Sequence, residues 1–210
     1  MKGLLLKDLY MAARYCRFYV AISLVFAVAS IWGNNIFFMI YPVLMTTVIP
    51  VNLISYDEKS KWSVYAGTFP YSREELVSIK YVMTLIFLGI GVLMIVAAQA
   101  VKMVIYGALD WKLLGLFTAV LPFVGLTGPC IMLPAIFKFG VEKGRGIFYA
   151  VIIVVCALYG AVGAIGADSD IMVFLLTTGI WIVPAFFAAG LLLLWGSWRL
   201  SIKFYEKREL

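Results

Sequence analysis

The chain has 210 residues, of which 64% are hydrophobic and 13% are charged, and its net charge is +6. Soluble domains contain about 45–50% apolar and about 25% charged residues, so this composition is typical of a polytopic membrane protein. The chain has no histidine, which excludes a His-based metal site or triad, and its three cysteines lack zinc-ligand spacing. The positive charge does not indicate nucleic-acid binding, because the basic residues gather beside apolar runs.

Continuous apolar runs predict the transmembrane helices. About 20 apolar residues are needed to cross about 30 Å of hydrocarbon as a helix. Six runs meet this requirement, at approximately residues 18–33, 36–55, 81–107, 113–137, 147–166 and 171–198. The runs do not alternate apolar with polar residues, which excludes a transmembrane barrel. We predict an all-α fold with six spans in a single transmembrane domain over residues 1–210.

The basic residues predict the orientation of the chain. With the N-terminus in the cytoplasm, 15 of the 17 Lys and Arg residues lie on the cytoplasmic side, and only Lys102 and Lys112 lie outside. Cytoplasmic loops are enriched in Lys and Arg, so both termini are expected inside. The alternative is a signal peptide cleaved near Ala27-Val28-Ala29, but the segment before Phe18 is long and contains Asp8.

Residues 1–17 are expected to form an amphipathic helix at the membrane interface. Its apolar face has helical periodicity and consists of Leu5, Leu9, Ala12 and Cys16. Its basic residues are Lys2, Lys7, Arg14 and Arg17. A basic amphipathic helix can lie in the headgroup region. The alternative is a cytoplasmic extension of the first span.

Several spans have features that predict local irregularity. Pro42 and Pro50 are expected to kink the second span, and a cluster of prolines and glycines around Pro129 to break or kink the fourth. Lys102, near the outer end of the third span, is expected to extend its ammonium group to the interface. Residues 138–146 are expected to form a flexible basic turn, and the sixth helix to continue into a cytoplasmic tail at 199–210.

The polar segment at residues 56–80 is predicted to contain two short helices. The first, at 57–66, places Asp57 four residues before Lys61, which favours an ion pair. Its apolar stripe is predicted to be Trp62, Tyr65 and Ala66. Gly67 is its expected stop, with Pro70 just beyond.

The second helix of this segment is predicted to begin at Ser72. Ser72-Arg73-Glu74-Glu75 matches a capping box, and Tyr71 with Leu76 matches a hydrophobic staple. This helix is expected to continue directly into the third span. Without further pattern, a charged segment of this kind is most simply interpreted as a solvated loop.

The chain has no visible energy source of its own. It lacks the phosphate-binding pattern G-x-x-x-x-G-K-[ST]. Its 11 acidic residues all lie in predicted loops or at span ends, whereas ion-coupled carriers usually keep an acid or histidine at membrane depth. We therefore expect no catalytic residue, no metal site and no bound cofactor, and infer that any transport depends on an external energy source.

The order of motifs resembles a known family. Met1–Tyr10 is similar to the N-terminal helix of ABC-2 type permeases of bacterial ABC transporters, in the short six-span group. Tyr56–Trp62 followed by Thr68–Val77 and Lys80 resembles the family pattern of an acid, a Trp, a proline turn and Ser-Arg-x-x-hydrophobic-Val. The resemblance by layout covers nearly the whole chain.

The resemblance implies partners and roles that composition does not supply. A second permease chain, identical or paralogous, and separate ATPase subunits that bind ATP and Mg would complete an exporter in the bacterial cytoplasmic membrane. Residues 56–80 would be the coupling segment, and some members export amphipathic or antimicrobial peptides. The residues implied to dock the ATPase are Glu58, Trp62, Tyr65, Pro70, Ser72, Arg73, Glu74 and Glu75. The alternatives are a stand-alone carrier or channel and a structural membrane protein.

Overall fold

The computed structural model describes residues 2–33, 36–66, 68, 71–106, 111–147, 149–150, 153 and 182–207. Every regular element in these ranges is α-helical, as predicted. The helices are α1 Lys2–Tyr15, α2 Arg17–Trp32, α3 Ile36–Thr47, α4 Ile49–Lys59, α5 Trp62–Ala66, α6 Arg73–Ile105, α7 Trp111–Phe139 and α10 Ile182–Glu206. Residues 141–147 form a further short helix.

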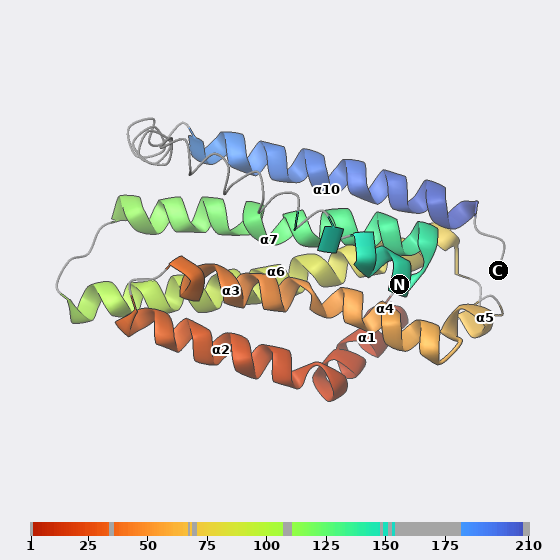
Figure 1. Cartoon of the computed structure of the whole chain (residues 1–210), viewed down its shortest axis with the longest axis horizontal. Helices are drawn as coiled ribbons and strands as arrows, with labels where there is room; N and C mark the ends of the chain where they lie inside the picture. The colour runs from red at the N-terminus through yellow and green to blue at the C-terminus, as the bar shows by residue number, and fades with distance from the viewer. Residues whose placement is uncertain are drawn as a thin grey trace.

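The long helices run side by side along the molecule (Figure 1). α10 packs on α7, α2 packs on α3, and α3 packs on both α6 and α7. The short helices α1, α4 and α5 gather at one end, where α6 begins and α10 ends. A bundle of this kind places residues that are distant in sequence together at its two ends.

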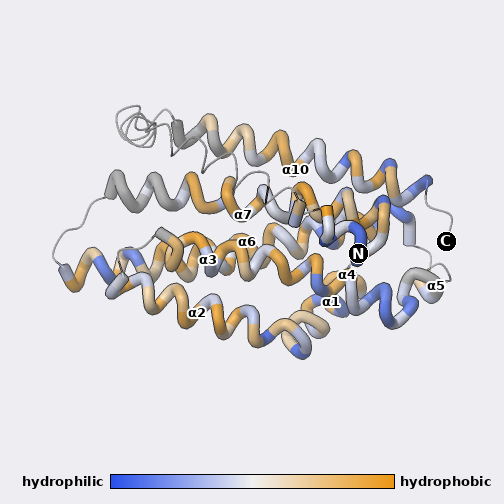
Figure 2. Tube along the Cα trace, viewed as in Figure 1, coloured by the Kyte–Doolittle hydropathy of each residue, from blue (hydrophilic) through white to orange (hydrophobic). Residues whose placement is uncertain are grey.

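Apolar residues cover most of the length of these helices (Figure 2). Three helical stretches are long and apolar enough to cross a membrane, namely Phe37–Lys59, Arg73–Ile105 and Val120–Phe139. A fourth is added if α1 and α2, which meet at 67°, form one broken span. This bend means that α1 is not a straight extension of the first span. The number six stays a prediction, because most of 147–166 and residues 171–181 lie outside the described residues.

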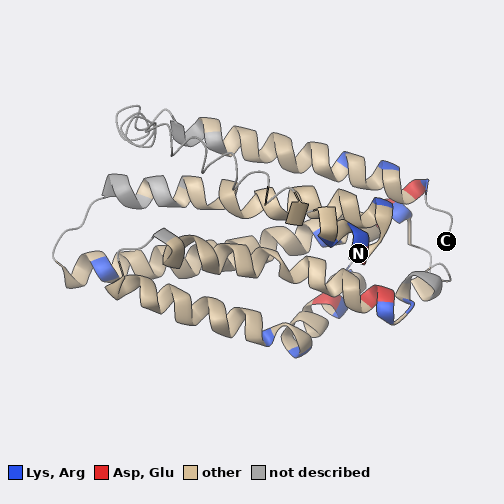
Figure 3. Cartoon of the chain, viewed as in Figure 1, with Lys and Arg blue, Asp and Glu red and all other residues tan. Residues whose placement is uncertain are grey.

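Most of the charged residues lie at one end of the bundle, which we call the charged end (Figure 3). α1, α4, α5, the start of α6 and the finish of α10 meet there. Near the opposite end, Lys102 of α6 donates hydrogen bonds to the carbonyl oxygens of Ser30 and Gly33, at 3.4 and 3.1 Å. Its ammonium group therefore binds the carboxyl end of α2. The sequence predicted only that this group extends to the membrane interface.

Of the two prolines expected to kink the second span, Pro42 lies inside the continuous α3 and Pro50 lies beside an interruption, and a kink stays a prediction. The span divides into α3 and α4 at Val48, and Pro50 lies in the first turn of α4. Proline has no amide hydrogen, so it cannot continue the hydrogen bonding of the preceding turn. Thr46 and Thr47 also donate their hydroxyls to the carbonyl oxygen of Val43, both at 3.0 Å, and such bonds bend helices.

The fourth span is not broken, because α7 continues through Pro122, Pro129 and Pro134, and the alternative of a kink stays a prediction. Pro134 leaves the carbonyl of Cys130 without its helical donor. Ser197 of α10 replaces that donor, with its hydroxyl 2.8 Å from the Cys130 oxygen. A hydroxyl from a neighbouring helix thus allows a proline inside an unbroken apolar helix.

Glycine permits the close contact between α3 and α6. A Cβ atom on Gly91 would lie 3.2 Å from the Cα atom of Val43 and would overlap the hydroxyl of Thr46. On the same helix, a Cβ atom on Gly89 would meet nothing within 4 Å. Alanine substitutions at the two positions therefore distinguish the effect of an added methyl group on packing from its effect on helix propensity.

We predict that Gly91→Ala destabilises the bundle and that Gly89→Ala does not. Overpacking costs about 1–3 kcal/mol, whereas replacing an open helical glycine by alanine favours the helix by up to about 1 kcal/mol. Thermal unfolding of the purified variants in detergent measures both effects. Equal midpoints for the two variants would contradict the proposed contact between α3 and α6.

Candidate functional site

The segment that joins α4 to α6, residues 60–72, is the candidate site, and we call it the connecting segment. The prediction of one helix over 57–66 is wrong, because Asp57 belongs to the last turn of α4 and α5 starts only at Trp62. Ser60 donates its hydroxyl to the carbonyl of Asp57 at 3.1 Å, and Lys61 has a positive φ of 53°. A left-handed residue ends a helix, so α4 and α5 are separated.

The predicted ion pair between Asp57 and Lys61 is also wrong. Asp57 instead binds Lys80 of α6, with 2.7 Å between Oδ2 and Nζ, and Lys7 of α1, with 2.5 Å between Oδ1 and Nζ. Lys80 also binds Asp8 of α1 at 2.6 Å. We call Lys7, Asp8, Asp57 and Lys80 the ion-pair cluster.

The ion-pair cluster is buried inside the charged end. Asp8, Lys80 and Asp57 are 1%, 7% and 8% exposed. Buried charges are tolerated when they are paired and hydrogen bonded, and the two lysines balance the two aspartates. The cluster therefore joins α1, α4 and α6 through groups that cannot separate without exposing an uncompensated charge.

Sequence reasoning missed Asp8 and Lys80 as members of a site. Asp8 lies in one helical row with Leu4 and Ala12, both of which are buried, and this acid in an apolar row was the available signal. Lys7 was assigned to the interfacial basic face, but it lies within the ion-pair cluster and 4.2 Å above the ring of Trp62. A cation above an aromatic face is attracted to it, so Lys7 links the cluster to α5.

The rest of α1 divides between protein contact and exposure. Ala12 and Cys16 belong to a core cluster with residues of α4 and α6, and Leu5 and Leu9 pack against it. The predicted apolar face therefore contacts protein. Lys2, Arg14 and Arg17 are exposed, as are Leu6 and Tyr10, and contact of this surface with lipid stays a prediction.

The capping box at the start of α6 is confirmed. The amide of Glu75 donates to the Ser72 hydroxyl, and the Glu75 carboxylate accepts from the amide of Ser72, both at 3.1 Å. From this point α6 runs without interruption to Ile105, as the sequence predicted. Glu75 therefore stabilises the helix start instead of presenting a free carboxylate.

Arg73 ties the start of α6 to the finish of α10. Its guanidinium donates to the carbonyl oxygens of Tyr205 and Glu206, at 3.3 and 3.0 Å. The last carbonyls of a helix lack intrahelical donors, so a basic side chain is favourable there. The predicted continuation of the sixth helix beyond residue 198 is confirmed, and it is this extension that Arg73 binds.

Residues 138–146 do not form the predicted flexible turn. α7 ends at Phe139, Gly140 has a positive φ of 86°, and residues 141–147 are helical. Glu58 accepts a hydrogen bond from the amide of Val141 at 3.1 Å, which caps this helix. Glu58 is thus engaged with the fold, 83 residues from its partner in sequence.

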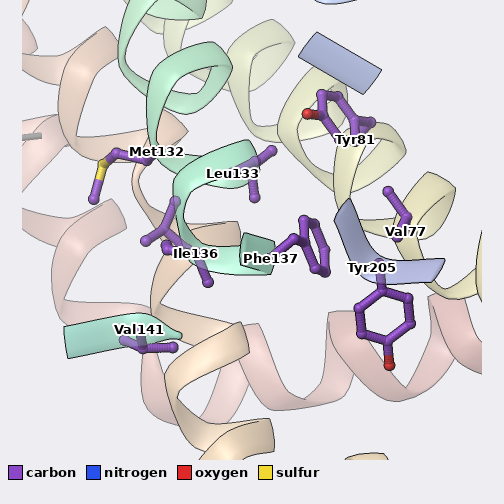
Figure 4. Packing of buried hydrophobic residues seen from close by; sticks show 9 residues of the cluster. Val77, Tyr81, Met132, Leu133, Ile136, Phe137, Val141 and Tyr205 are labelled. Carbon is purple, nitrogen blue, oxygen red and sulfur yellow. The ribbon is translucent and has the colours of Figure 1, made fainter. Parts of the chain in front are cut away.

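An apolar cluster lies at the start of α6 and the finish of α10 (Figure 4). Val77 and Tyr81 come from α6, and they pack with residues of α7, with Val141 and with Tyr205 of α10. A pocket of about 120 Å³ lies between this cluster and the ion-pair cluster, and Trp62 and Ala66 form part of its wall. Trp62 and Ala66 of α5 therefore lie across this pocket from the apolar cluster.

The predicted docking residues differ in how far their side chains are exposed. Tyr65 is 61% exposed, and Ser72 and Glu74 are also exposed. Trp62 is half-buried and Ala66 is 2% exposed, so the predicted stripe of Trp62, Tyr65 and Ala66 does not face one way. Pro70 and Gly67 lie outside the described residues.

We predict that Lys80→Met strongly destabilises the chain and that Asp8→Asn in the same variant partly restores it. Removing one partner of a buried ion pair costs about 3–5 kcal/mol, because it leaves an uncompensated charge, and the second change removes that charge. Lys203→Met, at an exposed position of α10, is the control. Thermal unfolding that shows no difference between Lys80→Met and Lys203→Met would contradict the role of the cluster.

Comparison with known proteins places the chain in a family. A family model described as ABC-2 family transporter protein matches residues 3–206. No curated protein and no solved structure matches the chain. The matched range extends from α1 to the last residue of α10 and includes the connecting segment and the ion-pair cluster. The chain therefore belongs to the ABC-2 transporter family, as a membrane-spanning permease component of an ABC transporter.

Proposed function

We propose that the chain is the permease subunit of an ATP-driven exporter and that the connecting segment, with the first turn of α6, is its contact with the ATPase. The observation that carries this proposal is the exposure of Tyr65 in the connecting segment and of Glu74 in α6, beside helices α1, α4 and α6, which buried ion pairs join to one another. Such a surface can transmit force, because the groups beneath it are held together.

The proposed contact differs from the set that the sequence suggested. Tyr65 and Glu74 present exposed side chains, whereas the exposed hydroxyl of Ser72 already accepts from the amide of Glu75, and Tyr is a residue type enriched at the energetic centre of protein interfaces. Glu58, Arg73 and Glu75 are engaged within the chain, and Trp62 lies beneath Lys7. These four residues position the contact surface and do not need to touch the ATPase.

In this proposal the ATPase binds ATP and Mg, and its closure moves the connecting segment. The ion-pair cluster links this movement to α1 and α4, and Arg73 links it to α10. A second permease chain would supply the other half of the translocation path. The charged end would face the cytoplasm of a bacterial cell, because Lys and Arg concentrate on that side of membrane proteins.

Amphipathic peptides, including antimicrobial ones, are the proposed substrates. The described spans carry few charges between the two ends of the bundle (Figure 3). A path lined by such helices would suit a molecule with a large apolar surface. A gradient-driven carrier and a structural protein are the alternative outcomes of the experiments below.

The first test is to purify the tagged chain from its native membrane in detergent and identify what remains bound. We expect an ABC ATPase in roughly equal amount. We predict that Tyr65→Ala lowers the retained ATPase at least about tenfold, since a central aromatic residue contributes about 2 kcal/mol or more to an interface.

The matched control is Tyr106→Ala, which removes a ring that is 60% exposed at the other end of α6, against 61% for Tyr65. We expect this control to retain the ATPase. An ATPase retained equally by both variants would contradict the assigned contact surface. A preparation without any ATPase would contradict the permease proposal and would favour gradient-driven flux, to be tested in liposomes.

A further inference from the structure

A polar hollow of about 630 Å³ lies at the charged end, between α4 and residues 139–145. Neither the connecting segment nor the ion-pair cluster needs this hollow for the function proposed above. Its wall includes the phenol rings of Tyr19 and Tyr56 together with Phe139. Aromatic rings beside basic groups are typical of the boundary between hydrocarbon and headgroups.

The charges that line the hollow are predominantly positive. Lys59, Lys143 and Arg145 face two acids, Glu58 and Glu142, which leaves a net charge of +1. Glu58 already accepts the amide hydrogen bond of Val141. Lys59 and Lys143 are exposed, and neither has a carboxylate within 4.0 Å among the described residues. The ammonium groups are therefore available to an anion.

Arg145, Asn52 and Ser55, which all line the hollow, are joined by hydrogen bonds. Arg145 donates from Nη2 to Oδ1 of Asn52 at 2.8 Å and to the hydroxyl oxygen of Ser55 at 2.6 Å. These bonds orient the amide of Asn52, because its oxygen must face the guanidinium. The amide nitrogen is then a buried donor without an acceptor among the described residues.

We propose that this hollow binds a phosphate group, carried either by an anionic phospholipid or by a soluble phosphate ester. A phosphate offers several acceptor oxygens and a negative charge, which match the guanidinium and the ammonium groups that line the hollow. Arginine has five N–H donors and uses only part of them on Asn52 and Ser55. The aromatic wall would lie against the glycerol and upper acyl region of a lipid.

The site has a structural consequence for the chain. Asn52 and Ser55 belong to α4, and Arg145 belongs to the helix at 141–147 that follows α7. A phosphate in the hollow would contact both elements and strengthen their connection. Asp57 of the ion-pair cluster also belongs to α4. The lipid or ester would therefore stabilise the position of the helix that precedes the connecting segment.

The test measures binding of short-chain phosphatidylglycerol to the purified full chain in a neutral detergent at about 0.15 M salt, where long-range charge effects are screened. The variant is Lys59→Gln with Lys143→Gln. Its matched control is Lys203→Gln with Lys207→Gln, which removes the same charge from exposed positions of the same end. Phosphatidylcholine of equal chain length and glycerol phosphate are measured beside it.

We expect the Lys59/Lys143 variant to bind phosphatidylglycerol at least about tenfold more weakly than the unmodified chain, since each basic residue near an anionic lipid contributes about 1 kcal/mol. The control pair is expected to change binding less than about twofold. Displacement of the lipid by glycerol phosphate would assign the site to a soluble ester, and its failure to displace would assign the site to the lipid.

Three results would overturn the proposal. Equal weakening by both variant pairs would show that only the net charge of this end matters. Unchanged binding in the Lys59/Lys143 variant, or no preference for phosphatidylglycerol over phosphatidylcholine, would show that the hollow does not take an anionic headgroup. Unfolding midpoints of all variants are compared to verify that these exposed substitutions leave the fold intact.

Discussion

The buried contact of Lys80 with Asp8 and Asp57 is the interaction on which the charged end depends. Three helices meet there, and each brings a charge that it could not bury alone. Lys7 adds a second positive charge and, through the ring of Trp62, joins the start of α5 to the same cluster. Because separation would leave an unpaired charge in an apolar setting, these elements are expected to move together.

The joining of these helices matters for the connecting segment, because both of its ends lead into them. A connecting segment without support would absorb a push from a partner by local bending. Here its N-terminal end leaves α4 just after Asp57, and its C-terminal end enters α6 through a capping box and the bonds of Arg73 to α10. The helix that follows spans 33 residues and runs from the charged end toward the opposite end of the bundle.

The sequence predicted correctly those features that depend on residues close together in the chain. The spacing of Ser72 and Glu75 predicted the cap of α6 correctly, and Pro50 lies beside the division of the second span. The errors arose where distant residues compete. Asp57 was paired with Lys61 by the i,i+4 rule, but its partners are 50 and 23 residues away. The helix at 141–147 likewise depends on a cap from Glu58 that no local pattern reveals.

The most direct test of the account replaces Tyr65 by a photoreactive phenylalanine analogue in the native membrane and identifies the cross-linked product. The same analogue at position 106 serves as the reference, because both tyrosines are similarly exposed. We predict an adduct between position 65 and an ABC ATPase, and none with the ATPase from position 106. An ATPase adduct from position 106, or its absence from position 65 in a complex that contains the ATPase, would contradict the assignment of the connecting segment.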